Sequence, residues 1–490
     1  MVKLALILFH IFLVIASVYA DATKPNVILI LTDDLGWGDL AVSGHPYVQT
    51  PNLDRMAQGG TVFNQFYTSS PVCSPTRATF QTGHYPARYS IHSAFDGRHK
   101  GADAMPSFLE PTAKQVSRMV RDNGYATAHY GKWHLSDAPK KHNFEVPNLS
   151  FYGFDDFRTY HTYFGGVDRK HHFVRGGDEH YRAKSSQAIV DETLEFMRKN
   201  PGEPVYINAW TLIPHAKLNP TPEQLAVYAN IDPDPADFPK HMREYLETIP
   251  PEELKERMQI YCAAVTGLDS AVGNLLDGIK EMGKEQETFI FFTSDNGPED
   301  NFSGTTRAGV GSPGELRGRK RSIYEGGVRT SAIAYWPGTV PAGQVNDTSI
   351  IAAVDWFPTV CALTGTAIDG LNLDGEDITD ILKGANRQRN KPIFWEWRFK
   401  VRGPETYSPP QLAVREGDWK LFMNPDGTKV ELYHIPDDPQ ELSNVADKYH
   451  ERVETMKATL LQWKGSLPTA PAVSSYVHDA EATPYRYGKR

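Results

Sequence analysis

The stretch Asn26-Val-Ile-Leu-Ile-Leu31 leads without a break into Thr32-Asp33-Asp34. A segment that is apolar at every position, and not only at alternate positions, is typical of a central strand in a parallel sheet covered on both faces. The segment Thr288-Phe-Ile-Phe-Phe292 repeats this pattern and ends at Thr293-Ser-Asp-Asn-Gly297. Weaker strand patterns occur at residues 204–209 and 330–336. We therefore predict one large sheet whose strands are mostly parallel.

Helical patterns separate these strands. Thr50 and Pro51 provide a cap residue and a proline at the first helical position, and Gly59-Gly60 marks the end of that helix. Residues 259–282 carry apolar side chains on one face, and residues 355–365 form a last predicted helix. Strands that alternate with helices indicate an α/β domain in which helices sandwich the sheet.

The pattern changes beyond about residue 370. Short strand-like segments are separated there by Gly, Asp and Pro turns, at residues 393–398, 411–415, 419–423 and 430–434. A helix is predicted near residues 445–464. We therefore expect a smaller subdomain of antiparallel sheet plus helix at 371–490, after a catalytic α/β domain at 21–370.

The first twenty residues are set aside from the fold. Lys3 precedes a mostly apolar run from Leu4 to Val18, and small residues follow at Val18-Tyr19-Ala20. This pattern predicts a secretory signal peptide at 1–20, since the run is too short and too weakly flanked for a spanning helix. We expect an exported protein, periplasmic or secreted, without a membrane anchor.

Composition excludes several classes of protein. The chain has 490 residues, of which 40% are hydrophobic and 23% charged, as in an ordinary globular protein. It carries 51 basic and 60 acidic residues, a net charge of −9, which argues against a nucleic-acid partner. Three cysteines in so long a chain cannot form a disulfide framework.

Two predicted strands end in acidic residues, Asp33-Asp34 and Asp295-Asn296. Ligands of parallel α/β sheets bind beyond the carboxyl ends of the strands. Adjacent carboxylates repel each other, and carboxylate and amide oxygens favour calcium or magnesium over zinc. Either pair alone could simply cap the following loop. Both pairs at matching strand ends favour a metal site.

A third element is Pro71-Val-Cys73-Ser-Pro75-Thr-Arg77. Pro75 marks a helix start, which places Cys73 at or just before a helix N-terminus, where the helix dipole favours an anion. Arg77 lies four residues further and so faces the same way. Cys73 could be a small buried apolar residue, or a nucleophile beside an arginine that holds an anionic substrate.

These residues resemble the formylglycine-dependent sulfatases of the alkaline-phosphatase superfamily. Cys73-Ser-Pro-Thr-Arg77 is similar to their Cys-x-Pro-x-Arg core, with Thr76 where serine is commoner. Gln81-Thr-Gly-His84 departs from the usual Leu-Thr-Gly-Arg. Further matches are Gly131-Lys-Trp-His-Leu135, Pro214-His215, Ser294-Asp-Asn-Gly297, Gly318-Arg-Lys-Arg-Ser-Ile-Tyr-Glu-Gly-Gly327 and Glu431-Leu-Tyr-His-Ile-Pro-Asp-Asp-Pro-Gln-Glu441.

The resemblance implies a sulfuric ester hydrolase in which Cys73 is oxidised to formylglycine (3-oxoalanine) by a formylglycine-generating or sulfatase-maturing enzyme. It implies one calcium ion, held by Asp33, Asp34, Asp295, Asn296 and the modified Cys73. Arg77 and Lys132 would hold the sulfate and the formylglycine diol, and Lys320 would bind a sulfate oxygen near the leaving group. His215 would protonate the departing alkoxide, and His134 would accept the diol proton that ejects sulfate.

Alternatives remain at this point. A phosphoester or phosphonate hydrolase of the same superfamily typically binds two zinc ions through several histidines, whereas neither acidic pair here contains one. A catalytically silent binding protein would keep the pocket and leave Cys73 unmodified. We expect a sulfated oligo- or polysaccharide substrate, with a small aryl or lipid sulfate as the second choice. Arg317, Arg319 and Arg321 could meet neighbouring sulfates or be plain surface charge.

Overall fold

The computed structural model describes residues 24–96, 105–136, 147–159, 178–300, 309–401 and 403–468. The predicted signal peptide at 1–20 lies outside these ranges. Within them, every helix is too short or too polar to cross a membrane.

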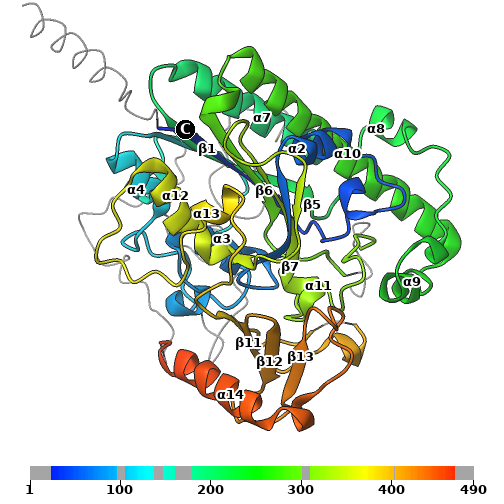
Figure 1. Cartoon of the computed structure of the whole chain (residues 1–490). Coiled ribbons are helices and arrows are strands. Elements are labelled where there is room, and N and C mark those ends of the chain that lie inside the picture. Colours follow the sequence, from blue (N-terminus) through cyan, green and yellow to red (C-terminus); the bar gives the residue numbers. More distant parts are fainter. Residues whose placement is uncertain are drawn as a thin grey trace, which may run out of the picture.

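A nine-stranded sheet forms the centre of the larger part of the molecule. Its strand order is β4-β3-β5-β1-β6-β7-β2-β8, with β9 also paired to β2. Figure 1 labels β1, β5, β6 and β7, which lie at the centre of this sheet. Strand β7 is antiparallel to both of its neighbours, and the other pairs are parallel. The prediction of a mostly parallel sheet is confirmed. The strands are β1 (Asn26–Asp33), β2 (Thr61–Tyr67), β3 (Ala126–Gly131), β4 (Asp156–Thr159), β5 (Val205–Pro214), β6 (Thr288–Ser294), β7 (Arg329–Tyr335), β8 (Gln344–Asn346) and β9 (Ile351–Ala352).

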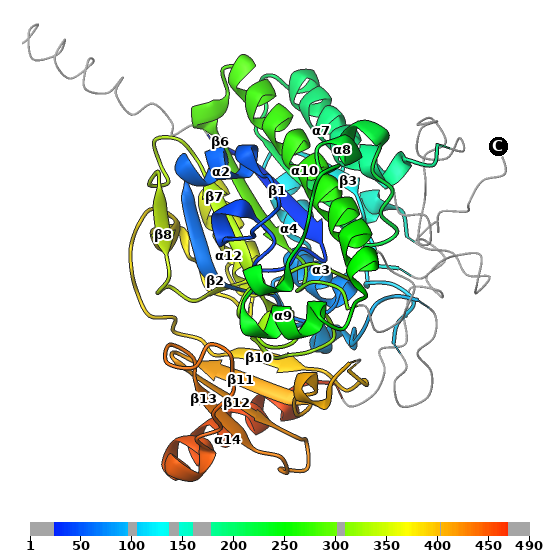
Figure 2. The same ribbon diagram turned by 90° about the vertical axis from the view of Figure 1, so that its right-hand side faces the viewer.

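Helices cover both faces of this sheet, because the side chains of its central strand are apolar on both sides. Ile28 and Ile30 of β1 pack with α2, α7 and α10, whereas Val27 and Leu29 pack with α3, α4 and α12 (Figure 2). The helices are α2 (Pro51–Gln58), α3 (Cys73–Thr82), α4 (Val116–Asp122), α7 (Tyr181–Lys199), α8 (Pro222–Ala226), α9 (Lys240–Leu246), α10 (Pro251–Glu281), α11 (Glu325–Val328), α12 (Trp356–Thr364), α13 (Thr379–Leu382) and α14 (His450–Gly465). Helix α10 begins at Pro251, before the predicted start near residue 259. The prediction missed its first turns because they are mostly polar and lack an apolar period.

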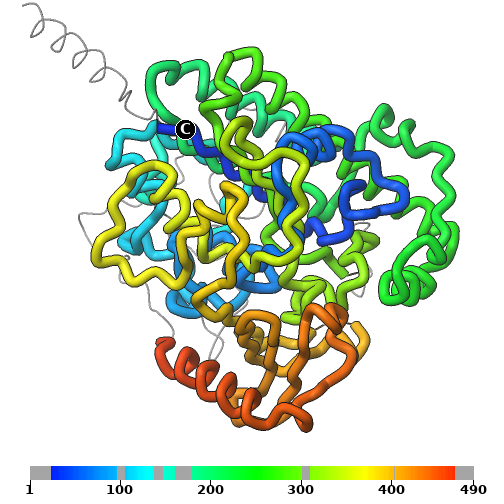
Figure 3. Tube along the Cα trace, viewed as in Figure 1, coloured from blue at the N-terminus to red at the C-terminus, as the bar shows by residue number. Residues whose placement is uncertain are grey.

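A second, four-stranded antiparallel sheet follows in the order β10-β11-β12-β13, with α14 packed against it. Its strands are β10 (Ile393–Glu396), β11 (Leu412–Glu416), β12 (Trp419–Met423) and β13 (Glu431–His434). The predicted antiparallel sheet and helix are thus confirmed. They lie together at one end of the molecule (Figure 3). One apolar cluster containing Tyr67, Ile323 and Trp395 joins them to the larger part.

The sheet register brings four of the sequence motifs to one edge. Parallel strands β1 and β6 pair Thr32 with Ser294, so the residues that follow both strands emerge side by side. Strands β3 and β5 run in the same direction and end at Gly131 and Pro214. The polar residues that come directly after these four strands therefore lie at the carboxyl edge of the sheet.

Candidate active site

The acidic residues at the ends of β1 and β6 are fully buried. Asp33 and Asp295 have no exposed surface, and Asp34 is 1% exposed. Asp34 has a left-handed backbone with φ of 68°, which aspartate tolerates better than most residues, and its N–H donates to Asp295 Oδ1 over 3.2 Å. This turn folds the second aspartate of the pair back over the neighbouring strand end.

Cys73 is the first residue of α3, as the proline two positions later predicted. Its Sγ and one carboxylate oxygen each from Asp33, Asp34 and Asp295 all lie within 4.8 Å of one another. Burial raises the pKa of the Cys73 thiol to about 12, although the nearby lysines act in the opposite direction. An unmodified Cys73 is therefore a neutral thiol at pH 7, and a poor nucleophile.

Two of the carboxylates are each held by a buried cation. Lys132, directly after β3, places its Nζ 2.8 Å from both oxygens of Asp33. Arg77, one helical turn after Cys73, donates through Nε to Asp295 Oδ2 over 2.8 Å and through Nη1 to the Lys132 carbonyl over 3.0 Å. Its guanidinium also lies over the Trp210 ring, 5.2 Å from the centroid, which fixes its plane.

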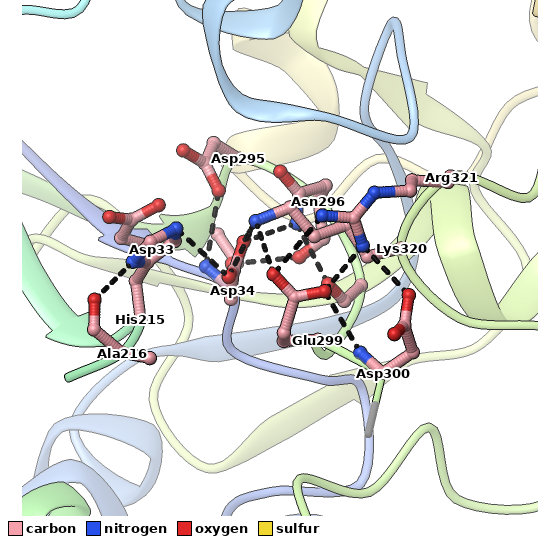
Figure 4. Close-up of polar contacts among 12 residues, drawn as sticks. Asp33, Asp34, His215, Ala216, Asp295, Asn296, Glu299, Asp300, Lys320 and Arg321 are labelled. Atoms are coloured by element: carbon pink, nitrogen blue, oxygen red, sulfur yellow. Dashed lines mark hydrogen bonds and ion pairs between the residues drawn. The ribbon is translucent and has the colours of Figure 1, made fainter. Parts of the chain in front are cut away.

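The third carboxylate has a lysine of its own, from a distant loop. Lys320 Nζ lies 2.6 Å from both oxygens of Asp34 (Figure 4). The loop that carries this lysine is held against the end of β6, because the Lys320 N–H donates to the Pro298 carbonyl over 3.0 Å and the Gly297 N–H donates to the Gly327 carbonyl over 3.0 Å.

The two predicted proton-transfer histidines lie on the segments that follow β5 and β3. His215 Nδ1 lies 2.7 Å from the Ala216 carbonyl, which can only accept, so Nδ1 carries the hydrogen and Nε2 faces Asp34 Oδ2 at 3.8 Å. Burial lowers the pKa of His215 to about 3, although Asp33 acts against this shift. His134 is 5% exposed and has a left-handed backbone with φ of 52°. It follows Lys132 closely, on the same segment after β3.

The donor set suits a hard cation. The Nδ2 of Asn296 donates to Asp34 Oδ1 and to the Gly297 carbonyl, each over 2.8 Å. Its buried Oδ1 accepts no hydrogen bond within the described part of the chain. Burial raises the pKa of Asp34 to about 6, and it also raises that of Asp295. The oxygens of these carboxylates converge, and their negative charges repel one another. A divalent cation would remove this repulsion, so the donor set fits a calcium ion.

Three further side chains belong to this site, and the sequence analysis did not assign them this place. Glu299 Oε2 lies 3.3 Å from Lys320 Nζ. Arg321 donates to Glu299 and, over 2.8 Å, to Asp300 Oδ2. The available signal was the acidic pair that comes two residues after Asp295-Asn-Gly297 at a strand end.

The arginines beside Lys320 make hydrogen bonds to groups of their own chain. Arg319 is 2% exposed, donates to the Glu299 carbonyl over 3.0 Å and lies over the Tyr245 ring, 4.2 Å from its centroid. Arg317 donates to the Thr406 carbonyl over 2.6 Å. The alternative of plain surface charge is therefore wrong for Arg319, which is buried.

Comparison with known proteins agrees with this geometry. The family profile "Sulfatase" matches residues 25–366, and the profile "N-sulphoglucosamine sulphohydrolase, C-terminal" matches residues 317–465. The chain is 29% identical to N-acetylgalactosamine-6-sulfatase from Homo sapiens, over 92% of this chain and 88% of the relative. It is 30% identical to arylsulfatase A from Homo sapiens, over 85% of this chain and 78% of the relative.

A solved structure shares both the fold and part of the sequence. Ps i-CgsB in complex with k-i-k-neocarrahexaose superposes on this chain with a TM-score of 0.70 and 26% identity. The alignment covers 92% of this chain and 95% of that chain. The first family profile alone spans more than half of the present sequence. The chain therefore belongs to the sulfatase family of sulfuric ester hydrolases.

Proposed function

We propose that this protein removes sulfate from a sulfated oligo- or polysaccharide, with Cys73 as the precursor of the nucleophile. One observation carries the proposal. Cys73 stands at a helix N-terminus within 4.8 Å of three carboxylates, each of which is held by its own buried cation. This arrangement supports a reactive position that would lie between a divalent cation and a bound anion.

The balance of charge supports an anionic substrate. Three aspartates and three cations cancel within the cluster. A divalent cation held by the aspartates would leave Arg77, Lys132 and Lys320 free to bind the oxygens of a sulfate ester. Bound there, calcium supplies charge that polarises the sulfate oxygens and orients the attacking group.

Maturation of Cys73 is part of the proposal. The buried thiol is neutral, and conversion to formylglycine would supply a hydrated aldehyde with two hydroxyl groups, one to attack the sulfur and one whose deprotonation would expel sulfate. A formylglycine-generating or sulfatase-maturing enzyme is the partner that this conversion requires. Export through the predicted signal peptide at 1–20 would bring the mature protein to external sulfate esters.

The histidines would move protons on the two sides of the sulfur. His215 has its Nδ1 fixed by the Ala216 carbonyl, so Nε2 is the atom that would give a proton to the departing alkoxide. A sulfate anion beside the ring would raise the pKa of His215 from its low value. His134 would take the proton that restores the aldehyde and releases sulfate.

The names of the relatives guide the choice of substrate. One is named for the 6-sulfate of N-acetylgalactosamine, and one solved neighbour is bound to a neocarrahexaose. Both are carbohydrates, whereas arylsulfatase A is named for aryl esters. We therefore rank sulfated carbohydrates before aryl sulfates. Which sugar and which position are questions for the assay.

The test is sulfate release from a panel of sulfated mono-, oligo- and polysaccharides, an aryl sulfate and an aryl phosphate. Wild type and Cys73→Ala are both produced with a formylglycine-generating enzyme, and mass spectrometry of the Cys73 peptide measures maturation. We expect sulfate release from a carbohydrate by wild type, and at least about 1,000-fold less by Cys73→Ala. Phosphate release without sulfate release by matured wild type would overturn the proposal.

A further inference from the structure

Glu299 has no part in the proposed reaction, yet its carboxylate is built into the leaving-group side of the site. The side chain lies on the loop that follows β6, and the residue is 7% exposed. Its Oε2 is 3.3 Å from Lys320 Nζ, and its Oε1 accepts from Arg321. Burial works against its charge, but Lys320 and Arg321 together lower the pKa of Glu299. The buried carboxylate is therefore ionised.

Glu299 is the middle member of a row of alternating charges, which Figure 4 shows. Asp34 holds Lys320, Lys320 contacts Glu299, Glu299 accepts from Arg321, and Arg321 also donates to Asp300. Lys320 thus has a carboxylate on each of two sides. Without the charge of Glu299, only Asp34 would hold the lysine, and it would draw the Nζ away from an incoming sulfate.

The same carboxylate reaches the histidine of this side. One oxygen of Glu299, one oxygen of Asp34 and one ring nitrogen of His215 all lie within 4.8 Å of one another. Lys320 Nζ lies 2.6 Å from Asp34 and 3.3 Å from Glu299, so a positive charge of the chain itself lies between these two carboxylates. The protein supplies its own cation at this point.

We propose that Glu299 is a positioning residue for the leaving group, holding Lys320 and His215 where they meet the ester oxygen. The inference rests on the proposed sulfatase function and adds a residue to it. Glu299 touches neither the position of Cys73 nor the carboxylates of Asp33 and Asp295 in any contact given by the structure. Its largest effect should therefore be on departure of the alcohol, the step in which Lys320 and His215 act.

The decisive variant is Glu299→Gln, which keeps the size of the side chain and removes its charge. Departure of nitrophenolate needs little assistance, whereas departure of a sugar or alkyl alkoxide needs a proton and a nearby cation. We expect kcat for a sulfated sugar or an alkyl sulfate to fall about 100-fold, with less than about a 5-fold loss for 4-nitrophenyl sulfate. A plot of log kcat/KM against leaving-group pKa should become steeper.

Asp300→Asn is the matched control, since Asp300 binds the same arginine over 2.8 Å, whereas Glu299 pairs with both this arginine and Lys320. It loosens the loop through Arg321, and we expect a leaving-group dependence parallel to that of wild type. Circular dichroism and the unfolding midpoint establish that each variant is folded. Should Glu299→Gln not fold, Glu299→Asp, which keeps the charge at a greater distance, should steepen the same plot to a smaller degree.

Two results would overturn the inference. One is an equal loss for good and poor leaving groups in Glu299→Gln. The other is a steepening of the same size in Asp300→Asn, which would assign the effect to the loop. A failure of the proposed function is a different result, because matured wild type would then release no sulfate from any ester. Active wild type, inactive Cys73→Ala and a uniform effect of Glu299→Gln would refute only the role of Glu299.

Discussion

The charged residues at the strand ends and those between the two sheets are both buried, but their carboxylates are neutralised in different ways. We use "strand-end cluster" for Asp33, Asp34, Asp295, Arg77, Lys132 and Lys320, and "seam cluster" for Tyr67, Glu325, Arg415, Lys420 and Glu441. In the strand-end cluster, carboxylate oxygens from three aspartates converge within 4.8 Å of one another and of Cys73. Such oxygens gain from a cation that comes from outside the chain.

In the seam cluster, each charged side chain is paired with an opposite charge of the chain itself. Lys420 of β12 lies 2.8 Å from Glu325 Oε1, 3.0 Å from Glu441 Oε1 and 3.0 Å from the Ile323 carbonyl. Glu441 Oε2 accepts from the Glu325 N–H over 2.7 Å, and Tyr67 donates to Glu325 Oε2 over 2.7 Å. Burial raises the pKa of Glu441 to about 7, against the effect of Lys420. The same kinds of residue thus form the proposed metal site in one place and a buried contact between the two sheets in the other.

The largest expected effect on stability is at the seam. Lys420→Met would leave Glu325 and Glu441 buried and facing each other, so we expect the free energy of unfolding to fall by about 3 kcal/mol or more. Urea denaturation in the absence of metal measures this. Lys457→Met breaks an exposed pair with Glu454, 2.9 Å apart, and should cost less than about 0.5 kcal/mol. Equal losses in the two variants would contradict the comparison.

Calcium should stabilise the protein through the strand-end cluster and not through the seam cluster. At a calcium concentration 100 times its dissociation constant, the free energy of unfolding of wild type should rise by about 2.7 kcal/mol, since the ion binds only the folded state. Lys420→Met should show the same rise from its lower starting value. In Asp34→Asn the rise should disappear, because a charged ligand is lost. Denaturant titrations with and without chelator provide the measurement, and a rise retained in Asp34→Asn would place calcium elsewhere.

A smaller effect is expected from His45, a buried titratable group outside both clusters. His45 Nδ1 accepts from the Tyr47 and Val48 N–H groups over 3.2 and 3.1 Å, and burial lowers the pKa of the ring to about 4. The unfolded chain then binds more protons than the folded one between pH 4 and 6.5, so stability is lost as the pH falls through this range. Between pH 7 and 5.5 we expect a loss of about 1 kcal/mol.

His45→Asn keeps an acceptor for the two N–H groups and removes the titration. Its stability should therefore vary less than that of wild type between pH 7 and 5.5, by about the same 1 kcal/mol. Urea midpoints at several pH values measure the difference. Identical pH profiles in the two proteins would show that other groups, such as the carboxylates of the two clusters, control acid stability.

Much of the fold could be predicted because its signals are local. The apolar run of β1, the proline that begins α2 and the glycine after α12 each depend on residues that are neighbours in the chain, whereas Thr50 makes no capping hydrogen bond to α2. Strand β3 was not singled out, because polar residues such as Thr127 and His129 interrupt its apolar pattern, although the sheet buries both of them completely. The apolar period of α10 likewise did not reveal the first turns of this helix, because they are mostly polar.

By itself, the sequence determined which residues stand at the ends of strands and at the start of a helix, including Asp33, Asp295 and Cys73. Strand and helix formation follow from side chains within a few positions, so these assignments needed no partner from elsewhere in the chain. Only the tertiary structure decided that Lys320 pairs with Asp34, that Arg319 turns inward and that Glu299 lies between two cations. Such pairing depends on how loops distant in sequence pack together, since a charge is stabilised in the interior by whichever opposite charge the fold brings within a few ångströms.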